Sequence, residues 1–138
     1  MPYEIIGHTA DIRLKVWGSS PQELFLDALL GMTRILKSKI PKSEREAKGE
    51  GRKIEIASPD QTALLVDFLN EALLQANINK EVYNEAQFKS LSKKKLEADL
   101  SGIPVQEFDE DIKAVTYHEA EIKKRPDGQL ETTLIFDI

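Results

Sequence analysis

Two short segments at opposite ends of the chain carry the residue types best able to do chemistry. Residues 8 to 11 read His-Thr-Ala-Asp, so the imidazole of His8 stands three positions before the carboxylate of Asp11. At the other end Asp137 is followed by Ile138, whose main-chain carboxylate adds further oxygens. A titratable ring and several carboxylate oxygens can hold an ion, orient a substrate or make a turn. The choice among these depends on whether the two segments meet.

The acids at the end of the sequence favour a cation site. In the last predicted strand Asp137 alternates onto the side opposite Leu134 and Phe136. Its side chain and the carboxylate at Ile138 repel each other unless a cation or hydrogen-bond donors compensate. If the first and last strands are neighbours, Asp11 adds a third carboxylate, and hard ions such as calcium, magnesium or manganese prefer this oxygen set. The alternative is that Asp11 only makes a turn and the chain end frays in water.

The two histidines and one helical acid are further candidates. His118 follows Tyr117 in a predicted strand, and with His8 it could transfer protons or complete a metal shell. Hydrogen-bonded structural histidines are the simpler interpretation, because the sequence has no cysteine and no histidine pair at helical zinc spacing. Asp67 lies on the polar side of a predicted helix with Asn70. It is either part of a solvated stripe or a support for the ion site or a docking surface.

Two helices have clear start signals. Ser20 can cap the first, with proline next and Glu23 as the second half of a capping box. An apolar stripe then runs to about residue 37, which predicts a one-sided surface helix. The second start, Ser58 to Gln61, repeats the pattern with Ser58 as the cap. Its main stripe runs from Leu64 to Ala76, and Val66 and Leu74 add apolar groups on the far side, so we expect this helix to be covered on most of its circumference.

Strands account for most of the remaining chain. Alternation predicts strands at 13–17 and 53–56, and two strands within 85–102 that turn around the lysine-rich residues 92–95. Residues 115–124 and 129–138 flank a proline-then-glycine turn at 125–128, which predicts a closing hairpin. Residues 37–51 are expected to form a loop. The sequence therefore predicts a single domain, 1–138, with an α+β fold in which two helices pack on a mixed or antiparallel sheet.

Composition limits the classes of function. The chain has 138 residues, 41% hydrophobic and 31% charged, without a segment near the ~20 apolar residues of a membrane span. The lack of cysteine and of a signal-peptide pattern points to a cytoplasmic protein. The net charge of −5 does not favour direct binding to RNA or DNA. The basic runs at 37–48 and 93–95 lack interleaved aromatic residues, so we interpret them as solvated loops.

Four segments, in order along nearly the whole chain, together resemble the archease family. They are HTADIRLKVWG near the start, LLVDFLNEALL in the second helix, IKAVTYHEAEI before the last hairpin, and FDI at the end. The resemblance implies a non-catalytic protein cofactor of the RNA ligase that joins tRNA halves. That ligase uses GTP and passes through a covalent ligase-histidine-GMP intermediate. Such a protein promotes guanylylation and multiple turnover of the ligase. Its association with RNA is indirect, through the ligase.

The resemblance also implies residue roles. The family's metal site corresponds to Asp11, Asp137 and the terminal Ile138, and the segments containing His8, Asp67 and His118 match family motifs without an assigned role. Arg13 departs from the family pattern, which more often has a small residue there, and a cation at this position could lower the charge available to the ion. Two other functions remain open: a metal-dependent phosphoesterase with a histidine as proton carrier, and a general chaperone or modulator of nucleic-acid-processing proteins.

Overall fold

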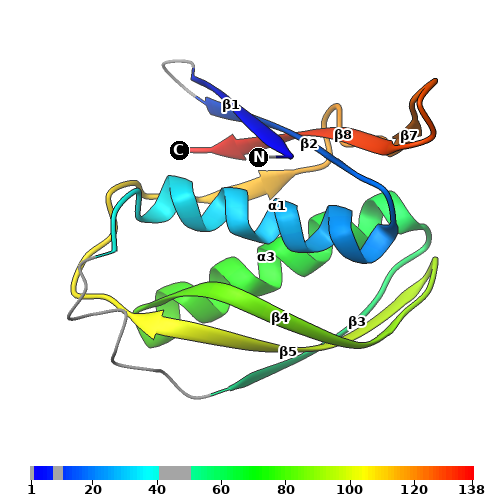
Figure 1. The fold of residues 1–138 in the computed structure, drawn as a ribbon. Helices are drawn as coiled ribbons and strands as arrows, with labels where there is room; N and C mark the ends of the chain where they lie inside the picture. The colour runs from blue at the N-terminus through cyan, green and yellow to red at the C-terminus, as the bar shows by residue number, and fades with distance from the viewer. Residues whose placement is uncertain (1, 8–10, 41–50) are drawn as a thin grey trace.

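The protein consists of two helices enclosed between two antiparallel sheets. The structure, a computed structural model, describes residues 2–7, 11–40 and 51–138. Helices α1 (Pro21–Leu36) and α3 (Gln61–Asn79) form the middle layer, with one sheet above and one below (Figure 1). The α+β class and the antiparallel pairing are confirmed, while the division of the strands into two sheets was not predicted. Within the described residues no helix is long and apolar enough to cross a membrane.

The first sheet, called here the terminal sheet, joins both ends of the chain. It has the order β1-β2-β8-β6, with β7 also paired to β8. Its strands are β1 (Tyr3–Gly7), β2 (Asp11–Gly18), β6 (Ala114–Thr116), β7 (Lys123–Lys124) and β8 (Leu130–Asp137). Strand β8 pairs with β2 along the full length of both. The sequence therefore predicted β2 and β8 correctly, but it gave no signal for β1, which pairs with β2 at the sheet edge.

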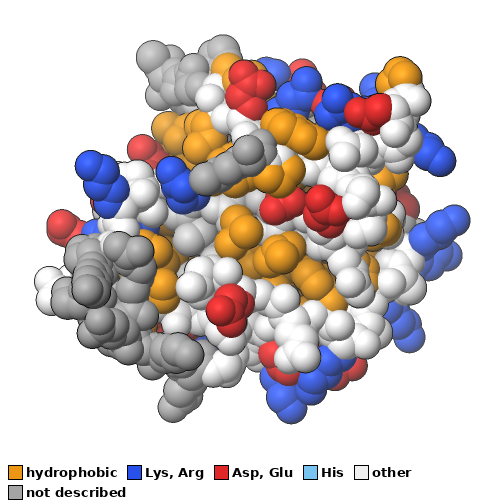
Figure 2. All heavy atoms as spheres, in the orientation of Figure 1, with side chains coloured by type: hydrophobic (Ala, Val, Ile, Leu, Met, Phe, Trp, Pro, Cys, Tyr) orange, Lys and Arg blue, Asp and Glu red, His pale blue; other side chains and the backbone are white. Residues whose placement is uncertain are grey.

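The second sheet is called here the middle sheet because its strands come from the middle of the chain; it is an outer layer of the molecule. Its strand order is β3-β5-β4. Its strands are β3 (Arg52–Ala57), β4 (Glu81–Leu91) and β5 (Lys95–Pro104). The predicted turn is confirmed, because the Ser92 N–H donates to the Lys95 carbonyl at 2.9 Å. The lysines of this turn are exposed. In Figure 2, Lys and Arg side chains gather along the right-hand edge, the end at which the β4–β5 and β7–β8 turns lie.

The helix caps agree with the sequence in one case and differ in the other. The Ser20 hydroxyl accepts the N–H of Glu23 at 3.2 Å, as predicted, but the Glu23 carboxylate reaches back to Ser19 instead of to the cap residue. At α3 the predicted Ser58 cap is wrong. Asp60 immediately precedes the first helical residue and its carboxylate accepts the Ala63 N–H at 2.8 Å, so the hydroxyl of Ser58 lies too far back to cap and is free to bond elsewhere.

The first arm of the predicted closing hairpin is not one strand. Only β6 and β7 remain of 115–124, because Glu119 has a φ of 63°, in the left-handed region that interrupts a strand. The hydroxyl of Thr132 donates to the Ala120 carbonyl at 2.7 Å and fixes this break against β8. The turn itself is confirmed: the Gly128 N–H donates to the Arg125 carbonyl at 2.9 Å, and its φ of 88° suits glycine.

The core lies on both sides of the helix layer. The predicted stripe of α1 is buried against β2 on one side and β4 on the other. Three aromatic rings, Phe25, Phe68 and Phe88, connect the two helices to the middle sheet with centroids 5.7 to 6.4 Å apart. On the far side of α3, Val66 is fully buried but Leu74 is 51% exposed. The expectation that α3 is covered on most of its circumference is therefore confirmed at Val66 and wrong at Leu74.

Candidate metal site

The two acids singled out in the sequence are direct cross-strand partners. Asp11 is the first residue of β2 and Asp137 the last of β8, and the antiparallel register places them opposite each other. Residues in this relation project from the same face of a sheet with Cβ atoms about 4.5 to 5.5 Å apart. These two acids, 126 positions apart in the sequence, therefore lie side by side on the outer face of the terminal sheet. The condition stated from the sequence, that the strands carrying them are neighbours, is met.

The last strand is held on both sides at this point. Asp137 also pairs with Ala114 of β6, and its carbonyl accepts the Lys113 N–H at 2.7 Å. Ile138 is half-buried and packs against the hydrophobic core. The main-chain oxygens of Ile138 thus follow directly after a residue whose backbone is held on both sides, so the alternative of a fraying chain end is wrong for Asp137.

One oxygen of the site lacks a partner. Asp11 Oδ1 is buried and accepts no hydrogen bond from any described residue. A buried acceptor without a donor is costly, whereas a cation would satisfy it. The oxygen-only donor set suits a hard divalent ion. In the part of the chain that the structure describes, no three His, Asp or Glu side chains gather into a metal cluster, so an ion here would also need main-chain, water or partner oxygens.

Arg13 lies on the same face but points its charge elsewhere. It follows Asp11 by two positions on β2, and its Nη1 donates to Glu119 Oε2 at 2.5 Å. The Arg13 guanidinium is therefore engaged by a carboxylate other than the two aspartates, and its effect on the affinity for an ion stays a prediction.

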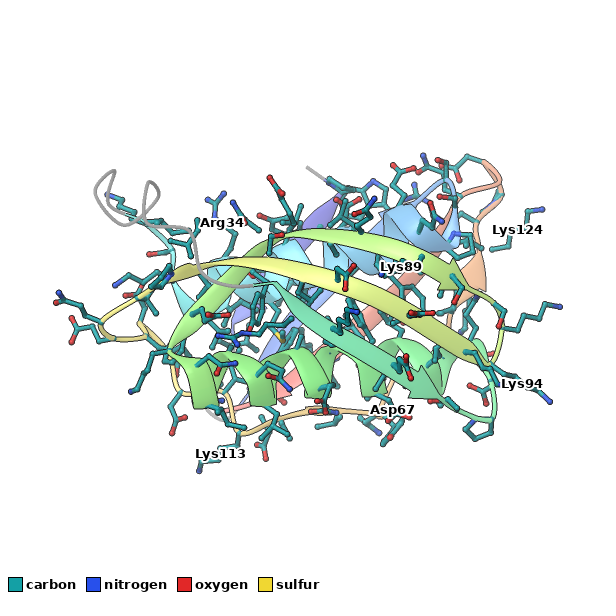
Figure 3. The ribbon with its side chains drawn as sticks, turned by 90° about the horizontal axis from the view of Figure 1, so that it is seen from below. Arg34, Asp67, Lys89, Lys94, Lys113 and Lys124 are labelled. Carbon is teal, nitrogen blue, oxygen red and sulfur yellow. The ribbon has the colours of Figure 1, made fainter. Side chains whose placement is uncertain are left out.

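Asp67 belongs to a separate cluster. Its carboxylate accepts hydrogen bonds from the Ser58 hydroxyl at 2.6 Å and from the phenol of Tyr117. The bond to Asp67, with a smaller contribution from burial, raises the pKa of Tyr117 above its ordinary value. One turn along α3, the amide of Asn70 bonds both the N–H and the carbonyl of Val115, each at 2.8 Å. Figure 3 shows Asp67 on the side of α3 along which this later segment runs.

Asp67 thus fastens the segment after β6 to α3, and its part in an ion site or a docking surface stays a prediction. Of the two histidines, His8 lies outside the described residues. His118 is exposed and lies in the turn after β6, where a strand was predicted. Sequence reasoning missed Tyr117 and Glu119 as interacting residues. The only signal was their position in the motif around His118, since their contacts depend on tertiary structure.

The fold and the site define a small α+β protein in which the first and last predicted strands pair and present two carboxylates on one face. The model of the Archease protein family matches residues 3–138. The chain belongs to the archease family.

Individual relatives agree with this assignment. The chain is 32% identical to the protein archease of Methanosarcina barkeri over 137 residues, covering 91% of this chain and 89% of the relative. It is 31% identical to the protein archease of Pyrococcus abyssi, covering 99% and 98%. The solution structure of Methanobacterium thermoautotrophicum protein 1598 aligns with a TM-score of 0.74 at 25% identity over 99% of both chains. A Thermotoga maritima archease described as a possible chaperone has the same fold, with a TM-score of 0.66, 20% identity, and coverage of 98% and 96%.

Proposed function

We propose that this protein is a non-catalytic activator of a GTP-dependent RNA ligase that joins tRNA halves, and that it acts through a divalent cation held by Asp11, Asp137 and the main-chain oxygens of Ile138. Membership of the archease family supports the ligase as partner. The observation that carries the cation site is the buried Asp11 Oδ1, which has no donor among the described residues and lies across the strand pair from a second carboxylate.

The two carboxylates would have different tasks. Asp11 is partly buried and would fix the ion against the sheet, while Asp137 is exposed and would hold it where a partner can reach it. A bound divalent ion supplies positive charge with coordination positions left for oxygens of the partner. Calcium takes about six to eight oxygen ligands, more than the protein offers here.

The proposed effect on the ligase is conformational or involves delivery of the ion. The acidic face would dock next to the metal-dependent site of the ligase and favour the state that accepts GTP, which requires higher affinity for that state than for the others. RNA would be contacted by the ligase, since the net charge of this chain is −5.

A guanylylation assay with the cognate ligase tests the proposal. The wild-type protein should accelerate formation of the ligase-GMP adduct, and Asp11→Asn or Asp137→Asn should lower that acceleration by at least about tenfold, the consequence of losing a charged ligand. Glu85→Gln is the matched control, because it removes the same charge from an exposed position on the middle sheet. Circular dichroism should confirm that all variants keep the fold.

Two results would contradict the proposal. Full stimulation by either aspartate variant would exclude the cation site as the cause of activation. Hydrolysis of a generic phosphodiester by the isolated protein with Mn²⁺ would instead support a phosphoesterase, and its dependence on Asp11 would place that activity at the same carboxylates.

A further inference from the structure

We propose that Glu119 is a positioning residue that holds Arg13 away from Asp11 and Asp137, and thereby keeps both carboxylates available to a cation. The inference rests on the proposed cation site and deepens it by naming a pair of residues that sets its charge.

Arg13 is placed where it could neutralise the site. It lies two positions after Asp11 on the same face of β2, and its register partner Ile135 lies two positions before Asp137. Diagonal neighbours of this kind have Cβ atoms about 7 to 8 Å apart, within reach of a long side chain. Guanidinium groups bind carboxylates with two parallel hydrogen bonds, so the pair of acids is a strong competitor for Arg13.

The structure leaves two complementary groups unjoined on this strand. Asp11 Oδ1 is a buried acceptor and Arg13 Nε a buried donor, and neither has a hydrogen-bond partner among the described residues. Both lie on the outer face of β2, yet they do not pair. Arg13 Nη1 instead meets Glu119 Oε2 at 2.5 Å, across 106 positions of sequence. The contact with Glu119 therefore explains why Arg13 does not donate a hydrogen bond to Asp11, although both lie on the same face of β2.

Glu119 is held in an unusual backbone conformation to make this contact. Its φ of 63° lies in the left-handed region, which glycine adopts far more readily than other residues. Such conformations persist where surrounding contacts maintain them. Here the next residue is tied to β8 through Thr132 and Ala120. The segment after β6 thus presents a carboxylate to Arg13 from a fixed position.

The arrangement separates charges by function. With Arg13 on Glu119, that pair is neutral and the two aspartates keep both negative charges. With Arg13 on the aspartates, one of those charges would be compensated, and affinity for a divalent ion depends strongly on the charge of its ligands. Glu119 therefore acts on the cation through Arg13 and needs no contact with the ion.

Calorimetric titration with Mn²⁺ across a double-mutant cycle tests the inference. Glu119→Gln should weaken Mn²⁺ binding by about tenfold, because Arg13 is released toward the acids. Arg13→Met should bind at least as tightly as wild type, and the double variant should recover to within about threefold of wild type. Glu131→Gln is the matched control: it removes a carboxylate that pairs with Lys15 at 3.2 Å on the same sheet face but far along β8, and it should leave the affinity unchanged.

The outcomes separate this inference from the proposed function. If Glu119→Gln binds like wild type, or loses the same factor with and without Arg13, the inference is wrong while the cation site stands. If wild type itself fails to bind Mn²⁺, both are wrong. Glu119→Gly guards against misfolding: it suits the left-handed backbone and should reproduce the weak binding of Glu119→Gln while keeping a cooperative unfolding transition.

Discussion

At the scale of single residues, the phenol of Tyr117 is a sensitive probe of how the segment after β6 is held. It donates a hydrogen bond to Asp67, and this bond raises the pKa of Tyr117. A raised pKa in the folded state means that the stabilisation is complete below the unfolded pKa near 10 and is lost as pH rises through the folded value. We therefore expect the free energy of unfolding to fall in alkaline solution partly because of this group.

Tyr117→Phe should remove that part of the pH dependence. Urea unfolding measured at several pH values around and above 10 should give a shallower alkaline decline for the variant. Tyr83 is buried and also has a raised pKa, so a residual decline should remain in both proteins and only the difference reports on Tyr117. Parallel declines in wild type and variant would show that the Tyr117 phenol does not couple to folding through Asp67.

The residues of the candidate site differ in how far the sequence could predict them. Asp11 and Asp137 could be predicted as partners because strand alternation fixes their face and only one pairing of strands was needed to bring them together. Glu119 could not, because its left-handed backbone belongs to a segment that is held in place by the hydrogen bond from Thr132 to Ala120, a contact the local sequence does not indicate. Local sequence preferences favour a strand there, and tertiary contacts override them.

At the scale of elements, Asn70 connects α3 to β6 in place of a strand neighbour. Its amide forms two hydrogen bonds of 2.8 Å with the backbone of Val115, so it satisfies a donor and an acceptor of the strand. Asn70→Ala should lower the free energy of unfolding by about 2 kcal/mol, because two partly buried backbone groups lose their partner. Urea denaturation gives the measurement.

A matched variant is available in the same helix. Among the described residues the Asn77 side chain donates only to the Leu73 carbonyl within α3, at 3.0 Å, so Asn77→Ala should change stability by no more than about 0.5 kcal/mol. Equal losses in the two variants would mean that the connection between α3 and β6 contributes nothing beyond helix preference, and the role assigned to Asn70 would be wrong.

Helices were easier to predict than strands in this chain for a physical reason. The stripe of α1 and its Ser20 cap depend on residues within the helix, which the sequence lists in order. Strands depend on partners: β1 carries exposed Ile5 and Ile6 on its two faces, lacks alternation, and is a strand because β2 lies beside it. The displaced cap of α3 shows the limit for helices, where Ser58 and Asp60 were both chemically suitable and only the backbone decided between them.

At the scale of the whole molecule, the last strand completes the structure from inside a sheet. β8 lies between β2 and β6 in the terminal sheet, so the last strand is paired on both sides within a layer that covers both helices, while β1 lies at the edge of that layer (Figure 1). This closure also sets two carboxylates directly opposite each other, which destabilises a strand pair. The same two carboxylates that would bind a cation therefore lower the stability of the protein when no cation is bound.

Substitution of Asp137 should therefore change the free energy of unfolding in opposite directions without and with a bound ion. In chelator-treated protein, Asp137→Asn should raise the free energy of unfolding by about 0.2 to 1 kcal/mol, because it removes a repulsion between direct cross-strand neighbours. In Mn²⁺ at about one hundred times the dissociation constant, wild type should gain about 2.7 kcal/mol, since the ion binds only the folded state. The variant should gain far less, so the order of stability reverses.

Thermal unfolding with chelator and with Mn²⁺ measures both halves, and Glu85→Gln again controls for loss of one negative charge. A variant that is less stable than wild type under both conditions would mean that Asp137 contributes to the fold through hydrogen bonds and not as an ion ligand. An equal gain for wild type and variant would place the bound ion elsewhere. Reversal of the order is expected only if the acids repel each other in the empty protein and share the ion when it is bound.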